Sequence, residues 1–146
     1  MSFKATPPMG TKIRKQIHQL SSGQAAIPAI HGTAAALRIF HQITKDLGLQ
    51  TQDRLRILNL RRTKFFSSMK ESDPCLNQDA IERLGNFLLI VDLAENLAGD
   101  AANWLKATNT APVFSGKSPL EIIRRGEAEG ILSTLLYLRG SMGGWA

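Results

Sequence analysis

The sequence has few of the features that mark secreted, membrane-spanning or disulfide-stabilised proteins. Among its 146 residues there is a single cysteine, Cys75, which cannot close a disulfide within the chain. The longest apolar run, Phe87–Val91, is interrupted at Asp92 and falls far short of the roughly 20 residues that span a bilayer. The first residues also lack the continuous apolar stretch of a secretion signal. We therefore expect a cytoplasmic protein that does not enter a membrane.

Acidic residues are scarce in the first half of the chain. Residues 1–70 contain 12 Lys or Arg but only Asp46 and Asp53, a net charge of +10, whereas residues 71–146 carry a net charge of −4. Such asymmetry is typical of a protein whose basic half meets a polyanion and whose acidic half meets a different partner. The alternative is an unevenly charged surface that is merely solvated.

Residue sets that carry catalysis or bind metal are also missing. The three histidines share no ligand spacing with Cys75 or with one another, which argues against a zinc site. Gly116–Ser118 resembles the end of a phosphate-binding loop, but Ala111 stands where that motif requires glycine, and no strand pattern precedes it. We expect a protein that is not an enzyme and that holds neither a metal nor a cofactor.

What is present is helical periodicity, and it predicts an all-α fold. With 43% hydrophobic residues, the chain can form one compact domain or two small modules that share a core. Residues 1–32 are basic and aperiodic, so we expect an arm that orders only against a partner. The predicted helices cover residues 33–47, 51–58, 61–69, 77–98, 101–106, 119–125 and 127–138, and residues 140–146 are predicted to be non-helical.

Capping signals support several of these boundaries. Ser118-Pro119-Leu120-Glu121 is a capping box with proline at the first helical position. Asn77 is suited to begin the long helix 77–98, which we call the spine helix, and Gly99 to end it. The spine helix is apolar on several faces, which predicts burial from more than one side.

The two short helices at 51–58 and 61–69 have the tight spacing of a helix-turn-helix. Placing Asn59 at the turn points Leu55, Leu60 and Phe65 inward. The outward side chains, which suit base and phosphate contacts in a DNA groove, are Arg61, Arg62, Thr63, Lys64 and Ser67. Arg54, Arg56 and the arm would add phosphate contacts. Residues 33–75 are thus predicted to form a DNA-binding region, against the alternative of an ordinary bundle face.

Spaced positions in the C-terminal half resemble a known family. The pattern runs from Trp104-Leu105 through Asn109 and Phe114-x-Gly116-x-Ser118-Pro119-x-Glu121 to Gly126 and a final helix. It resembles the toxin-binding domain of Xre/MbcA/ParS-type antitoxins, and residues 63–66 and 77–84 resemble upstream parts of the same family. The resemblance covers about residues 35–146.

This resemblance implies an antitoxin of a type II toxin–antitoxin module. Its helix-turn-helix would repress its own operon at operator DNA, and residues 76–146, the spine helix and toxin-binding domain, would block a RES-type toxin that degrades NAD. A homodimer within a larger toxin–antitoxin complex is expected. The residues implied or inferred to serve toxin binding are Trp104, Asn109, Phe114, Arg139, Gly143, Gly144, Trp145 and Ala146. For Trp104 and Phe114 the alternative is packing in the core of this domain, without direct contact to the toxin.

The tail 143–146 is expected to enter the toxin's NAD pocket. An exposed tryptophan between glycine and the C-terminus has little core to join, and its ring and the terminal carboxylate would mimic parts of a dinucleotide. The alternative function is a stand-alone helix-turn-helix transcription regulator whose C-terminal part senses a small ligand.

Overall fold

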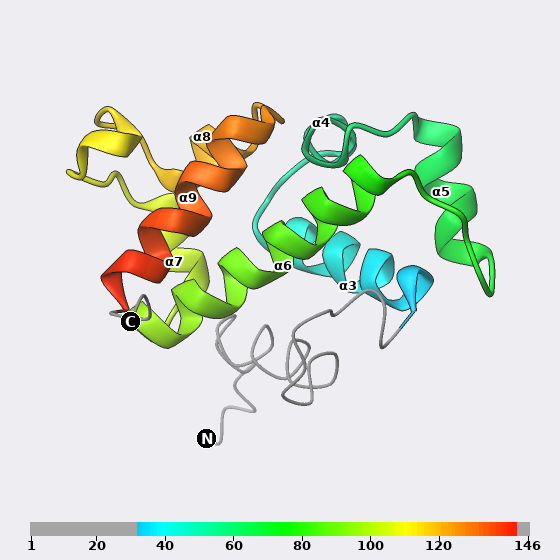
Figure 1. The fold of residues 1–146 in the computed structure, drawn as a ribbon, viewed down its shortest axis with the longest axis horizontal. Coiled ribbons are helices and arrows are strands. Elements are labelled where there is room, and N and C mark those ends of the chain that lie inside the picture. The colour runs from blue at the N-terminus through cyan, green and yellow to red at the C-terminus, as the bar shows by residue number, and fades with distance from the viewer. Residues whose placement is uncertain (1–31, 143–146) are drawn as a thin grey trace, which may run out of the picture.

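The computed structural model describes residues 32–142, and within this range the chain is all-α, as predicted (Figure 1). Seven α-helices and one short 3₁₀ helix follow one another, and no strand forms between residues 32 and 142. The helices are α3 (Thr33–Asp46), α4 (Thr51–Leu58), α5 (Arg62–Lys70), α6 (Gln78–Ala98), α7 (Ala101–Lys106), η1 (Pro112–Phe114), α8 (Pro119–Ile123) and α9 (Ala128–Ser141).

The spine helix α6 lies at the centre of the fold, with its ends where the sequence predicts them. Asn77 caps its start by accepting the N–H of Ala80 at 2.8 Å, and Gly99 ends it in the left-handed region at φ 76°. Helices α3, α4, α7 and α9 all contact α6. Because these helices lie on several sides of α6, its buried residues are spread around the helix and are not confined to one face.

Aromatic rings attach α3 to α6 and α5 to α3. Phe40 of α3 meets Phe87 of α6 and Phe65 of α5 in edge-to-face contacts, with ring centroids 5.0 and 6.2 Å apart. Gly48 follows the end of α3 in the left-handed region, at φ 82°, and Leu49 beyond it is buried. One aromatic cluster therefore fixes α3 and α5 on the spine helix.

The helices after α6 confirm one predicted cap and correct one predicted end. Asp100 accepts the N–H of Asn103, and Ser118 and Glu121 form the predicted capping box. Helix α9, predicted to stop at Leu138, continues to Ser141 through Gly140. Burial of Leu138 anchors the last turn, and its carbonyl accepts the N–H of Met142, so tertiary contact outweighs the low helix propensity of glycine.

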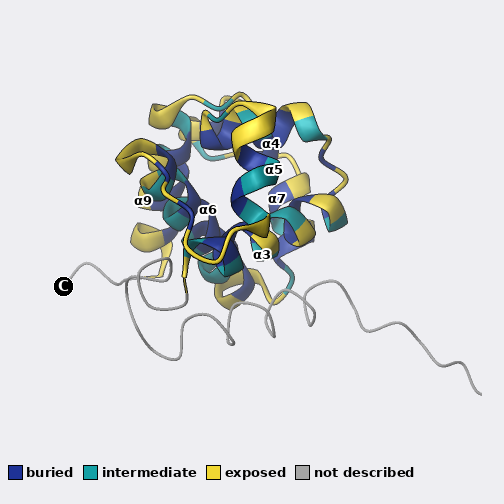
Figure 2. Cartoon of the chain, turned by 90° about the vertical axis from the view of Figure 1, so that its right-hand side faces the viewer, coloured by how far each residue is buried: buried dark blue, intermediate teal, exposed yellow. Residues whose placement is uncertain are grey.

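A single hydrophobic core joins the two predicted parts. The buried cluster runs from Ala36 in α3 to Leu138 in α9 and includes residues of every α-helix from α3 to α9. Figure 2 shows that the helices turn their buried faces inward and their exposed faces outward. The division at residue 75 thus crosses one continuous core, consistent with modules that share it.

Candidate functional site

The turn between α4 and α5 is closed by a residue in the left-handed conformation. Asn59 lies in the left-handed region, at φ 53° and ψ 49°. Its N–H donates to the carbonyl of Arg56 at 3.2 Å, and that of Leu60 donates to the carbonyl of Leu55 at 3.1 Å. These two bonds form a Schellman motif, in which Leu55 and Leu60, both partly buried, are the expected apolar pair.

The beginning of α5 presents four consecutive exposed side chains, Arg61, Arg62, Thr63 and Lys64, as the sequence predicts. Phe65, one residue further, is fully buried and holds this helix against α3. Ser67, also expected to face outward, is half-buried, and its hydroxyl donates to the carbonyl of Lys64 at 3.3 Å. The available polar surface is therefore concentrated in the first turn of α5.

Two contacts surround the aromatic residues of α5. The guanidinium carbon of Arg62 lies 6.0 Å from the ring centre of Phe66, at the range of a cation–π contact. His41 of α3 lies beside Phe65 and Phe66. Burial, and then the charges of Arg54 and Lys45, lower the pKa of His41 below its ordinary value. The imidazole beneath α5 therefore favours its neutral form.

The expected phosphate contact of Arg54 is wrong. Only 5% of this residue is exposed, and its Nε donates to Thr44 Oγ1 at 2.7 Å while Nη2 donates to the carbonyl of Leu49 at 2.9 Å. Burial lowers the pKa of Arg54, and the charge of Asp53 opposes that effect. Arg54 thus joins α4 to the end of α3, whereas Arg56, two residues on, is exposed.

A buried carboxylate joins α4 to the C-terminal helices. Asp53 of α4 is 3% exposed and accepts the N–H of Gln50 at 3.0 Å. The Nη2 of Arg124, at the end of α8, lies 3.4 Å from its Oδ1, and the Nη1 of Arg56 lies 3.6 Å from the same oxygen. Gly126 passes so close to α4 that an added Cβ would overlap the carbonyl of Arg56.

A cavity of about 310 Å³ opens at this junction. It is lined by Arg56 of α4 together with Glu121, Arg124 and Arg125 of α8 and the segment after it. No motif in the sequence pointed to this site, because the arginines that line it come from segments almost 70 residues apart.

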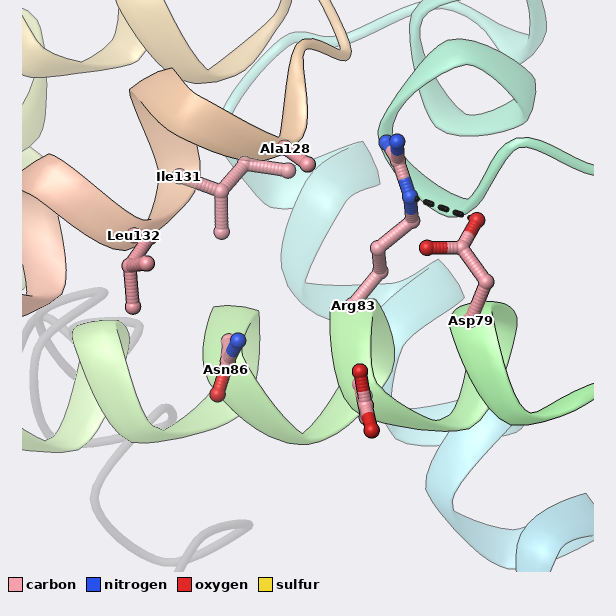
Figure 3. Close-up of a pocket in the computed structure, with 7 residues that line it drawn as sticks. Asp79, Arg83, Asn86, Ala128, Ile131 and Leu132 are labelled. Carbon is pink, nitrogen blue, oxygen red and sulfur yellow. Dashed lines mark hydrogen bonds and ion pairs between the residues drawn. The ribbon is translucent and has the colours of Figure 1, made fainter.

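A second cavity, of about 200 Å³, lies between α6 and α9 (Figure 3). In Figure 3, Arg83 and Asn86 rise from α6 towards Ala128, Ile131 and Leu132 of α9. The Nη1 of Arg83 donates to the carbonyls of Gly126 at 2.6 Å and Ile57 at 3.3 Å. This side chain therefore ties α4, α6 and the start of α9 together.

Asp79 holds Arg83 in place at the edge of that cavity. Its Oδ2 accepts the Nε of Arg83 at 3.0 Å and the side-chain amide of Asn59 at 3.3 Å. Burial acts to raise the pKa of Asp79, but these two hydrogen bonds and the charge of Arg83 together lower it. The turn between α4 and α5 is thus linked to α6 through an ionised carboxylate.

The aromatic residues of the C-terminal pattern pack on one another. Phe114 is fully buried, and its ring centre lies 6.0 Å from that of Trp104 and 5.1 Å from that of Tyr137. Direct toxin contact by Phe114 is therefore excluded in this conformation, and its part is to shape the domain. Trp104 is half-buried and stacks on Tyr137, so one side of the indole remains accessible.

Asn109 organises a loop, and its predicted toxin contact is at most partial. Its Oδ1 accepts the N–H of Ala111 at 2.9 Å, and its own N–H donates to the carbonyl of Lys117 at 3.1 Å. Arg139 is exposed in the last turn of α9, where a cation favours the helix dipole. The tail residues Gly143, Gly144, Trp145 and Ala146, and the arm before residue 32, lie outside the described residues.

An apolar surface on α9 was not predicted. Leu132 and Leu136, four residues apart and so on one side of the helix, are 48% and 43% exposed. Ile131, Leu135 and Leu138 of the same helix are buried in the core. One face of a helix cannot bury all of the apolar residues at positions 131, 132, 135, 136 and 138. The sequence could therefore have indicated that some of them are exposed.

Between residues 32 and 142, no three His, Cys, Asp or Glu side chains gather in a way that could hold a metal ion. None of the helices described there is both long and apolar enough to cross a bilayer.

No protein family, curated protein or solved structure was found to match the chain. The fold and the site therefore define a class only in structural terms. The described residues form an all-helical unit with a cationic helix start, two cavities and an exposed apolar pair on its last helix.

The close approach at Gly126 gives a matched test of the junction. Gly126 and Gly48 both have positive φ, 76° and 82°, but a Cβ at Gly48 would meet open space. Gly48→Ala should cost about 1–2 kcal/mol of unfolding free energy, the penalty of a left-handed L-residue. Gly126→Ala should cost more, because the carbonyl of Arg56 must also move. Urea unfolding of both variants measures the difference, and equal costs would contradict the close approach.

Proposed function

We propose that this chain is an antitoxin that binds operator DNA through the start of α5 and binds a RES-type toxin through its C-terminal helices and tail. One observation carries the DNA-binding half: four consecutive polar side chains, two of them arginines, are exposed in the first turn of α5. The toxin-binding half rests on the resemblance of the C-terminal pattern to Xre/MbcA/ParS-type antitoxins.

The first turn of a helix is well suited to nucleic acid. Its free N–H groups and dipole attract phosphate, and Arg61, Arg62 and Lys64 add positive charge at the same place. Arginine pairs in a bidentate manner with guanine in the major groove. Burial of Phe65 and Ser68 anchors the opposite side of α5, so the polar side chains are offered on a fixed helix.

If α5 reads bases, loss of its arginines should weaken binding to promoter DNA more than binding to random DNA. Arg61→Ala and Arg62→Ala should each weaken binding to a duplex from the chain's own promoter by about 1–3 kcal/mol, and weaken binding to a random duplex less. Fluorescence anisotropy at one salt concentration measures both affinities. Lys106→Ala, which removes one exposed charge from α7, is the matched control and should leave the preference between duplexes unchanged.

Two results would refute the role of α5. Equal losses on promoter and random DNA would reject base reading by these arginines. Unchanged affinity in both variants would reject α5 as the recognition helix.

The toxin-binding proposal combines an apolar surface with the tail. Leu132 and Leu136 expose an apolar pair on α9, the helix that leads into residues 143–146. Exposed apolar side chains at one place favour contact with another protein. The half-buried Trp104, stacked on Tyr137, adds an aromatic edge of the kind that is enriched in protein interfaces.

Removal of the tail tests whether it blocks the toxin's active site. Co-expression of the toxin with the chain lacking Gly143–Ala146 should lower cellular NAD, whereas the full chain should protect it. Trp145→Ala should show an intermediate loss, because the carboxylate remains. Lys106→Ala serves as the control that keeps protection. Full protection by the truncated chain would show that the tail does not occlude the active site.

The alternative, a stand-alone regulator that senses a small ligand, is favoured by the cavity of about 310 Å³ at the junction of α4 and α8. Co-purification separates the two functions. A neighbouring protein present in fixed ratio supports the antitoxin, and a lone chain carrying a metabolite supports the regulator.

A further inference from the structure

Three arginines meet in the cavity between α4 and α8, and neither the helix-turn-helix nor the C-terminal pattern assigns them a role together. Arg56 comes from α4, and Arg124 and Arg125 follow α8. The C-terminal part of the chain is acidic overall, so two adjacent arginines at this position stand out against their surroundings.

Asp53 fixes two of the three guanidinium groups. Its buried carboxylate lies 3.4 and 3.5 Å from the Nη2 of Arg124 and 3.6 Å from the Nη1 of Arg56. Because Asp53 also accepts the N–H of Gln50, the carboxylate itself is held by α4. The two arginines are thus positioned before any ligand arrives.

The charges around the cavity do not balance. The other carboxylate at the cavity is that of Glu121. Its Oε1 accepts the N–H of Ser118 at 3.4 Å and the hydroxyl of Ser118 at 3.2 Å. Three arginines against Asp53 and Glu121 leave an excess of one positive charge. Within residues 32–142, Arg125 makes no hydrogen bond or ion pair, so its donors are available to a ligand.

We propose that this cavity binds a phosphate group. Guanidinium groups pair with phosphate through parallel N–H···O bonds, which suits a site built from several arginines better than one built from lysines. The phosphate belongs to the backbone of the DNA that α5 reads. This choice of phosphate source rests on the proposed function.

The position of the cavity fits that source. Arg56 and Arg61 are five residues apart, so their Cα atoms lie within roughly 18 Å of each other. Figure 1 shows α4, the start of α5 and the segment between α8 and α9 along the upper edge of the molecule. The major groove is about 12 Å wide, so with α5 in the groove a flanking backbone is within reach of the cavity. The C-terminal part then contributes to DNA binding.

The test compares Arg125→Ala with the control Lys106→Ala on a random duplex between 50 and 200 mM salt, about the range over which phosphate contacts dominate affinity. A lost phosphate contact should reduce the slope of log K against log salt by about 0.9 in Arg125→Ala. Lys106→Ala should keep the wild-type slope. Because Arg125 is exposed and unpaired, both variants should melt like the wild type.

A titration with inorganic phosphate and pyrophosphate distinguishes the source. If the cavity binds the DNA backbone, Arg125→Ala changes the salt slope. If it binds a free phosphate compound, the slope is unchanged, and the titration shifts the amide NMR signals of residues 124–126 in the wild type but not in Arg125→Ala. Either result supports a phosphate site. An unchanged slope without such shifts overturns it. If the wild type binds no duplex, the proposed DNA binding fails, and the pyrophosphate titration alone decides the phosphate site.

Discussion

Burial of α6 on several sides is the constraint on which the rest of the fold depends. Helices α3, α4, α7 and α9 rest on it directly, while α5 rests on α3, and α8 on α7 and α9. Each large apolar side chain buried there contributes about 1.5–3 kcal/mol. One helix core can therefore hold both α5 and α9, on which the proposed DNA-binding and toxin-binding surfaces lie.

That shared core also sets how the two proposed surfaces are arranged. Arg83 on α6 donates to backbone carbonyls of Ile57 in α4 and of Gly126 before α9. Displacing either segment would break a hydrogen bond from a charged donor, worth about 1.5–3 kcal/mol. Asp53 and Arg124 add a second connection between α4 and α8. The α4–α5 pair is therefore not an independent module, and its orientation follows that of the C-terminal helices.

Local signals in the sequence predicted most of the fold, and long-range contacts account for what they missed. Asn59, Asn77 and the Ser118–Glu121 capping box act within one helical turn, so their residue types identify the boundaries. The burial of Arg54 depends on Thr44 in another helix, and the junction cavity depends on Arg124 meeting Asp53, 71 residues earlier. No spacing rule reaches that far. The predicted function rests on a resemblance that the fold neither requires nor contradicts.

Amide hydrogen exchange with and without a duplex from the chain's own promoter tests the central claim most directly. The first-turn amides of α5 lack helical acceptors, so they should exchange fast in the free chain and slowly when phosphate or base edges cover them. Slowing is expected at residues 61–64 and at 124–126, with unchanged exchange at 101–106. Slowing that spares α5, or that spreads evenly over the chain, would contradict it.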